Sequence, residues 1–363
     1  MPYVSDIVQP SIEWTAAILF KPFRFKKWLI LGFIALMAGH LAGGNFRASF
    51  PEPDDSRKPA REATIADTPG YTGVKTPLPS SPRENLRGFR DEVLKPPVYP
   101  ILILVATGVL IILLIFMWLA ARFNFVFLNA VTKNDTAIKA PFRAFKLPAN
   151  SYFTFNVVMT TLSLLLAALV AIIWFRTFIT LGAFDAPRTM GILSIILKSI
   201  PFLLALVVFI IIVSIVHCIA NDFVLVIMAA RNTTFMPAVH ESFILISRNT
   251  FATVKYLFIK MGLGICAGII AAIINLILLI GLLIPIIIVA AAFYALYSAT
   301  PLPAQPVVSV IVFIIAFPVM LTFWYCVACL HLPFAVFFRT LSIKFLGLLD
   351  NRYNLFTISQ KII

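Results

Sequence analysis

The sequence predicts an all-α polytopic membrane protein: a helical bundle of about six transmembrane helices, with interfacial amphipathic helices and internal hairpin repeats. The first observation is composition, because 61% of the 363 residues are hydrophobic and only 12% are charged. A soluble domain carries about 25% charged residues, and a chain of this length could not bury so much apolar surface in water. The composition therefore excludes a cytosolic enzyme, a secreted domain and a disordered chain.

The second observation is the spacing of the charges, which leaves uncharged runs long enough to cross a bilayer. A membrane helix needs about 20 apolar residues. The longest run, residues 261–338, contains 78 residues and a proline cluster at 301–306, so it predicts two helices, over 256–298 and 307–340. Four shorter runs predict one helix each: 28–46, 96–121, 147–175 and 199–221.

These spans divide the chain into three parts. Residues 1–44 comprise an N-terminal interfacial helix and the first membrane helix, and residues 98–363 form a membrane region of five helices. Between them, residues 45–97 hold nine prolines, nine Lys or Arg and eight Asp or Glu. Such a segment buries too little apolar surface to offset the entropy lost on ordering, so it predicts a flexible external loop.

Three shorter segments have the spacing of amphipathic helices, with apolar residues three and four positions apart. Helices of this kind lie in the headgroup region of a bilayer, with their basic groups near anionic lipid. The three segments are residues 11–21, 141–147 and 237–247.

The distribution of Lys and Arg predicts the orientation. With the N-terminus inside, 17 of the 29 basic residues fall on the inner side, and nine of the remaining twelve lie in the long loop, where they count little. We therefore expect a multi-pass protein of the cell (inner) membrane with both termini cytoplasmic. The net charge of +14 reflects this asymmetry. Because the chain has no dense basic run that could follow phosphates, no nucleic acid is expected as a partner.

An internal repeat is the third observation. Residues 125–153 align with residues 223–251 without a gap, at a shift of 98, with eight identities in 29 positions. The matched stretch runs from a helix end, through a polar turn and an interfacial helix, into the next span. We expect Phe145 and Phe243 to occupy equivalent places on the apolar sides of their interfacial helices.

The stretch from Ile18 to Phe33, with Leu19-Phe20-x-Pro22-Phe23-x-x-x-Lys27-Trp28 at its centre, resembles the start of the first membrane helix in a family of uncharacterised prokaryotic polytopic membrane proteins. Residues 223–251 resemble the repeated unit of the same family. The chain is also distantly similar to the membrane domains of glycerophosphodiester phosphodiesterases. The catalytic domain of those enzymes, with its metal ligands, is absent, so the resemblance implies no reaction and no catalytic residue.

Two groups of residues are candidates for a site. His217, Asn221 and Asp222 lie near the predicted cytoplasmic end of the fourth span, and ionisable groups inside a membrane are functional candidates by default. They are either a structural cap or interhelical hydrogen bond, with Asp222 reaching water, or a proton or ligand site. His40 is expected near the outer interface.

The second group consists of cations beside aromatic rings that precede two spans. Their spacing of three residues places each pair on one helical face, where it can contact anionic lipid headgroups or only set the orientation. The four residues are Arg24, Lys27, Arg143 and Lys146.

We find no nucleophile–base pair, phosphate loop or paired acidic motif, so no catalytic residue and no cofactor is expected. One metal-like spacing, Cys326-x-x-Cys329-x-His331, is interpreted as a coincidence within an apolar helix, because a zinc site needs four ligands. The expected function is a non-enzymatic membrane-embedded scaffold or lipid-associated protein, with membrane lipids, anionic ones included, as partners. The alternative is a transporter or channel for a small or lipid-like solute.

Overall fold

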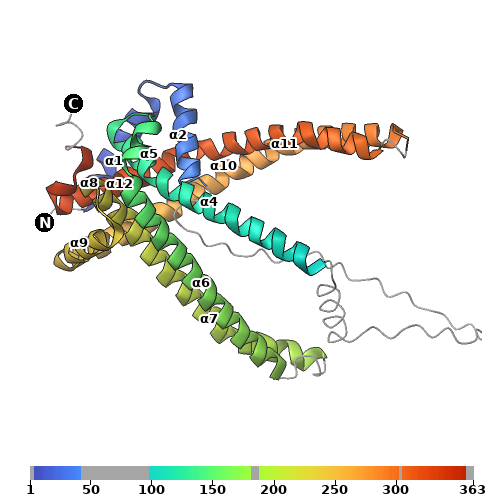
Figure 1. Cartoon of the computed structure of the whole chain (residues 1–363), viewed down its shortest axis with the longest axis horizontal. Coiled ribbons are helices and arrows are strands. Elements are labelled where there is room, and N and C mark those ends of the chain that lie inside the picture. The colour runs from blue at the N-terminus through green and yellow to red at the C-terminus, as the bar shows by residue number, and fades with distance from the viewer. Residues whose placement is uncertain (1–3, 42–97, 181–187, 302–304, 357–363) are drawn as a thin grey trace, which may run out of the picture. The chain divides into compact units, whose positions relative to one another are not determined.

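Every element of the computed structural model is helical within the residues that it describes, which are 4–41, 98–180, 188–301 and 305–356 (Figure 1). The predicted all-α membrane class is therefore confirmed. Residues 45–97, predicted as a flexible loop, lie outside the described residues.

The smaller of two compact units is formed by residues 48–116, and its described part is the first half of helix α4 (Val98–Lys133). The large apolar side chains of this segment are exposed, with Ile103 at 53% and Leu113 at 54%. Apolar side chains on all sides of a helix are typical of a span that faces lipid.

The larger unit contains residues 1–47 and 117–363 and begins at the N-terminus with η1 (Val4–Ile7), α1 (Val8–Phe20) and α2 (Phe25–Met37). After α4, the chain forms α5 (Lys139–Ala144), α6 (Lys146–Thr180), α7 (Arg188–Ile219), the π-helical turn η2 (Ala220–Val224), α8 (Leu225–Arg231) and α9 (Phe235–Arg248). The C-terminal part contains α10 (Thr250–Ala299), α11 (Gln305–Leu330), α12 (Leu332–Leu349) and η4 (Asn351–Tyr353).

Within the part of the chain that the structure describes, six helices are long and apolar enough to cross a membrane, by length and composition, which is the predicted number. Five of them have no buried residue in their most apolar window, whereas 56% of α12 is buried. The six segments are Pro100–Lys133, Lys146–Thr177, Ser199–Arg231, Thr250–Ala299, Gln305–Leu330 and Leu332–Leu349.

The set of six differs from the predicted set at both ends of the chain. Helix α2, within the predicted first span, has 13 residues and is about 20 Å long, which is shorter than the ~30 Å hydrocarbon core. The helix ends because Gly39 adopts a φ of 80°. The prediction of one helix over 307–340 is wrong, because the chain turns at His331 between α11 and α12.

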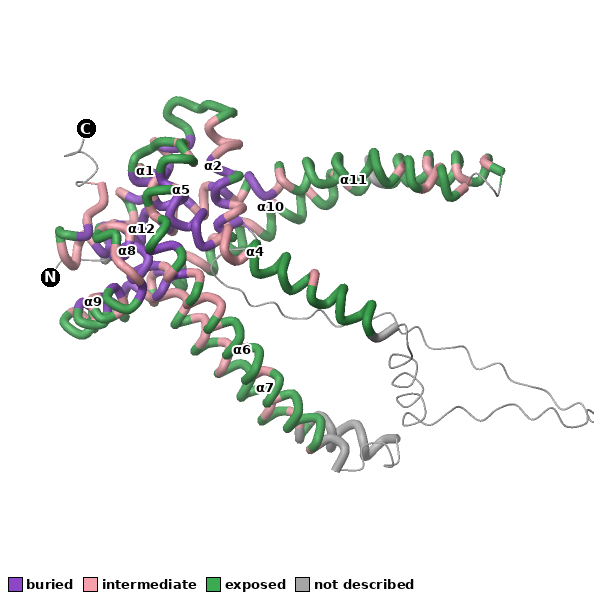
Figure 2. The backbone as a smooth tube through the Cα atoms, in the orientation of Figure 1, coloured by how far each residue is buried: buried purple, intermediate pink, exposed green. Residues whose placement is uncertain are grey.

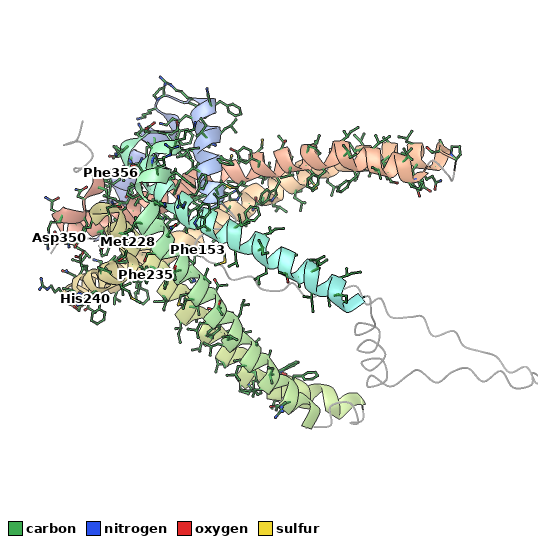
Figure 3. All side chains as sticks on the ribbon, viewed as in Figure 1. Phe153, Met228, Phe235, His240, Asp350 and Phe356 are labelled. Carbon is green, nitrogen blue, oxygen red and sulfur yellow. The ribbon has the colours of Figure 1, made fainter. Side chains whose placement is uncertain are left out.

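The buried core of the larger unit lies where the helix ends meet. Figure 2 shows buried residues at the ends of α4, α6, α7 and α10 and exposed residues along their outer parts. Helices α6 and α7 contact each other, as do α10 and α11, so they form two apolar hairpins that leave this core. Figure 3 shows Met228 and Phe235 inside the core, where they are 0% and 8% exposed, and His240 at its margin.

The three segments predicted as amphipathic helices are all helical. Residues 11–21 correspond to α1, residues 141–147 contain most of α5, and residues 237–247 lie within α9. Their placement in the headgroup region stays a prediction.

The two copies of the predicted repeat agree in part. Asn134 and Asn232, which are aligned, adopt φ values of 55° and 50° and are the only non-glycine residues with positive φ within the described residues. The expectation for the phenylalanines is wrong: Phe145 stacks on Phe125 at 5.6 Å, whereas Phe243 is 70% exposed. The reason is that α5 breaks at Phe145, while α9 continues past Phe243. The repeat itself stays a prediction.

Candidate functional site

The turn η2 interrupts the regular backbone between α7 and α8. A π-turn, with hydrogen bonds five residues apart, is rare and frequent at functional sites. It contains Asn221 and Asp222, and Asp222 is only 4% exposed. These two neighbours contact different helices, because Asn221 Oδ1 accepts a hydrogen bond from the hydroxyl of Tyr152 at 2.7 Å while Asp222 turns to α10.

Asp222 forms a buried ion pair with Lys260 of α10. The hydroxyl of Tyr256, one turn before Lys260, donates to the same oxygen, Asp222 Oδ2, at 2.8 Å. The thiol of Cys218 lies 3.6 Å from Asp222 Oδ2 and 3.6 Å from the Lys260 ammonium. A buried charge is tolerated when it is paired and hydrogen-bonded, and Asp222 meets both conditions.

Arg339 of α12 joins the ion pair to the N-terminal part of the chain. Its Nη1 donates to the carbonyl of Asn221 at 2.9 Å, and its Nη2 lies 2.8 Å from His40 Nε2 and 3.4 Å from Asn124 Oδ1. Nη2 is a donor, so His40 accepts through Nε2 as a neutral ring. Burial, and then the charge of Arg339, hold the pKa of His40 well below 6.5. His40 lies outside the six long helices.

Asn124 of α4 also contacts the residues that follow α2, because its amide nitrogen donates to the carbonyl of Ala38 at 3.2 Å; it donates as well to the carbonyl of Ala120 in its own helix at 2.9 Å.

Two stacked rings, Tyr256 and Phe345, lie beside the ion pair. Their centroids are 4.1 Å apart, and the residues are 0% and 1% exposed. We call the following six residues the polar cluster: Asn124, Asn221, Asp222, Tyr256, Lys260 and Arg339.

The structure places two of the three predicted polar residues, Asn221 and Asp222, in the polar cluster. The third, His217, packs near the ring of Phe155, with a centroid distance of 6.2 Å. The expectation that Asp222 reaches water is wrong, because Lys260 and Tyr256 enclose it.

His40 is also misplaced by the sequence, because α2 is too short to carry it to the outer interface. It lies instead beside Asn124 and Arg339. These two residues belong to helix ends that the sequence predicts to lie on the cytoplasmic side. Sequence reasoning missed Lys260 and Arg339 as site residues. The available signal was that these two cations enclose the 78-residue uncharged run.

The four predicted lipid contacts divide into two classes. Arg24, Arg143 and Lys146 are exposed, as headgroup contacts must be. Lys27 instead donates to the carbonyl of Ile18 at 2.8 Å and to Asn134 Oδ1 at 2.6 Å.

The Cys–Cys–His spacing at the end of α11 and the following turn does not form a cluster of ligands. Cys326 is exposed, whereas Cys329 is buried against Gly32, where an added Cβ would lie 2.5 Å from the Cys329 sulfur. His331 Nδ1 lies 3.1 Å from the carbonyl of Val327. Within the described residues, no group of three His, Cys, Asp or Glu side chains could hold a metal ion.

Long apolar helices joined by a buried polar cluster define a polytopic membrane protein. The chain belongs to a family of unknown function (DUF7544), whose model matches residues 2–356. No curated protein and no solved structure matches the chain.

Proposed function

We propose that this protein is a non-enzymatic membrane-embedded scaffold, whose polar cluster fixes the arrangement of the helix ends. The observation that carries the proposal is that the buried groups of the cluster bind one another across α4, η2, α10 and α12. Asp222, Lys260 and Arg339 are 4%, 7% and 5% exposed.

Along the outer parts of the helices, lipid tails are as apolar as Leu, so burial of apolar side chains there gives little driving force for one arrangement. The arrangement is therefore set at the helix ends. Polar groups that can bond only to each other therefore select one arrangement of helices. Burying such a group without a partner costs free energy. The helices therefore have to come together as a set, because each one supplies a partner for another.

The outer parts of the hairpins support a scaffold over a transporter. A solute pathway needs polar groups or a water-filled cavity at the middle of the span. The exposed side chains along the outer α6, α7, α10 and α11 are large and apolar, as at Leu164, Leu203, Ile284 and Ile315, which are 65%, 64%, 65% and 63% exposed.

A transporter or channel for a small or lipid-like solute is the second candidate. It is favoured by one observation, the Asp222–Lys260 ion pair beside a π-turn, because intramembrane ion pairs mark ion and proton pathways in other proteins.

Reconstitution into phosphatidylcholine–phosphatidylglycerol vesicles separates the two candidates. Proton flux under an imposed pH gradient, and release of an entrapped anionic dye, are compared between wild type, Asp222→Asn and empty vesicles. The scaffold proposal expects wild type to equal empty vesicles in both assays. Flux above that background in wild type that is lost in Asp222→Asn would overturn it, provided that both proteins incorporate equally.

The proposal extends to location and partners. We place the protein in the cell membrane with both termini cytoplasmic, and we take membrane lipids, anionic ones included, as its partners, because Arg24, Arg143 and Lys146 are exposed. The resemblance to glycerophosphodiester phosphodiesterase membrane domains stays a prediction, and it adds no catalytic residue to this proposal.

A further inference from the structure

We propose that Arg122 of α4, together with Asn150 of α6, forms a binding site for a phosphate group. Arg122 is a buried cation with few hydrogen bonds, and its Nε has no partner; the proposal is independent of the scaffold proposal.

Two aromatic rings lie beside the guanidinium of Arg122. Its central carbon lies 4.5 Å from the ring centroid of Trp118 and 4.8 Å from that of Phe142. These two rings contact each other edge to face at 6.2 Å. Because the two ring planes are nearly perpendicular, at 84°, at most one of them can lie parallel to the guanidinium plane. Both rings are within the distance at which an aromatic face attracts a cation, so they favour a charged group at this position.

The hydrogen bonds of Arg122 are few and long for a buried cation. Nη1 donates to the carbonyl of Phe142 at 3.4 Å and Nη2 donates to Asn150 Oδ1 at 3.2 Å, both neutral acceptors. Nε is buried and has no partner, and the residue is 8% exposed. A guanidinium has five N–H donors, so most of its bonding capacity is unused.

Arg122 also has no counter-charge among the described residues. The ion pairs there include Lys260–Asp222, Arg231–Glu241 and Arg352–Asp350, and none of these involves Arg122. Arg339, another buried arginine, differs from Arg122 in its hydrogen bonds, because its two terminal nitrogens have three neutral partners. A desolvated cation without an anion is costly, and a bound anion removes that cost.

The position of Arg122 indicates the class of anion. It is the first charge after the uncharged run 96–121, one turn beyond Trp118, and Trp with Arg is typical of the membrane–water interface. Lipid phosphates lie at that level. Phosphate oxygens accept parallel hydrogen bonds from the guanidinium fork, and the exposed cations Arg143 and Lys146, beside Phe142, add to the positive potential.

The test uses delipidated full-length protein in a nonionic detergent, with its thermal unfolding midpoint as the readout. The probes are dihexanoylphosphatidylglycerol, inorganic phosphate and, as a phosphate-free amphiphile, dihexanoylglycerol. We expect phosphatidylglycerol to raise the wild-type midpoint by about 3–5 °C at concentrations well above Kd, with no rise from dihexanoylglycerol. A matching rise with inorganic phosphate assigns the site to free phosphate; its absence assigns the site to a lipid headgroup.

Two variants test the residues. Arg122→Gln should lose the response, and Asn150→Asp should lose it while folding well, because its carboxylate, isosteric with the amide, supplies the missing anion 3.2 Å from Nη2. The control Arg352→Gln removes an exposed cation elsewhere and should respond like wild type. An unaltered response in Asn150→Asp, or no wild-type response to either phosphate probe, would overturn the proposal, whatever the flux assay shows.

Discussion

The carboxylate of Asp222 is paired with the ammonium of Lys260 inside the protein, across 38 positions of sequence, with side-chain exposures of 5% and 8%. The pair joins the π-turn to α10. Each charge depends on the other, because neither is solvated by water.

Removing one partner of this pair should destabilise the protein strongly. We expect Asp222→Asn to lower the free energy of unfolding in detergent by about 3–5 kcal/mol, because Lys260 is left as an unpaired buried charge. The sequence alone suggested a cost of about 1 kcal/mol at most, on the assumption that Asp222 reaches water.

The double variant Asp222→Asn/Lys260→Met removes both charges and should recover most of the loss. The exposed pair between Arg352 and Asp350 is the control, and Arg352→Gln should cost about 0–1 kcal/mol. Equal losses in the double variant and in Asp222→Asn would contradict a mutually dependent pair.

The contact between His40 and Arg339 should make the fold sensitive to acid. The pKa of His40 is held below 6.5 in the folded protein, first by burial and then by Arg339, with Lys260 acting in the same direction. The unfolded chain therefore takes up the proton first as the pH falls. The stability is fully present above pH ~6.5 and decreases below it, by at most about 1.4 kcal/mol per pH unit.

This loss is measured by comparing wild type with His40→Gln, which keeps an acceptor for Arg339 but does not titrate. The difference in unfolding free energy between the two proteins should favour wild type more at pH 7.5 than at pH 5.5. A constant difference across that range would show that His40 does not carry the effect.

Exposed and bonded cations should respond differently to neutralisation. Replacing Arg24, Arg143 and Lys146 by Gln should reduce the anionic lipid that co-purifies with the protein and leave its stability nearly unchanged, since a cation near an anionic surface contributes about 1 kcal/mol to binding. Lys27→Gln should instead lower stability by about 1–3 kcal/mol, because it loses charged hydrogen bonds to Ile18 and Asn134. Unchanged lipid content in the triple variant would remove the headgroup role.

Topology reporters check the predicted orientation. A reporter fused after Ile363 should be cytoplasmic, and one inserted near Thr76 should be external, because 17 basic residues then lie on the inner side. The second outcome requires the chain to complete before Thr76 the crossing of which α2 covers about 20 Å. An external C-terminus would contradict the prediction. A cytoplasmic signal at Thr76 would show that the chain does not cross the bilayer before α4.

The candidate site could be predicted only in outline. Asn221 and Asp222 are polar residues at the end of an apolar run, which is a local signal. Lys260 and Arg339 also flank an apolar run, residues 261–338. Lys and Arg at helix ends, however, usually face water and set the orientation of the protein in the membrane. Their burial depends on which helices meet them, and no local pattern contains that information. The division at His331 was missed for the same reason, since both sides of it are apolar.

The sequence by itself determined the helical membrane class, five of the six long apolar helices within the described residues and the helical state of three short segments, because composition and periodicity act within one segment. Only the tertiary structure decided that Asp222 pairs with Lys260 and that Arg339 reaches His40, across 299 positions of sequence. The physical reason is that a polar group in a membrane protein takes the partner that packing brings to it. That partner can be any polar group in the chain.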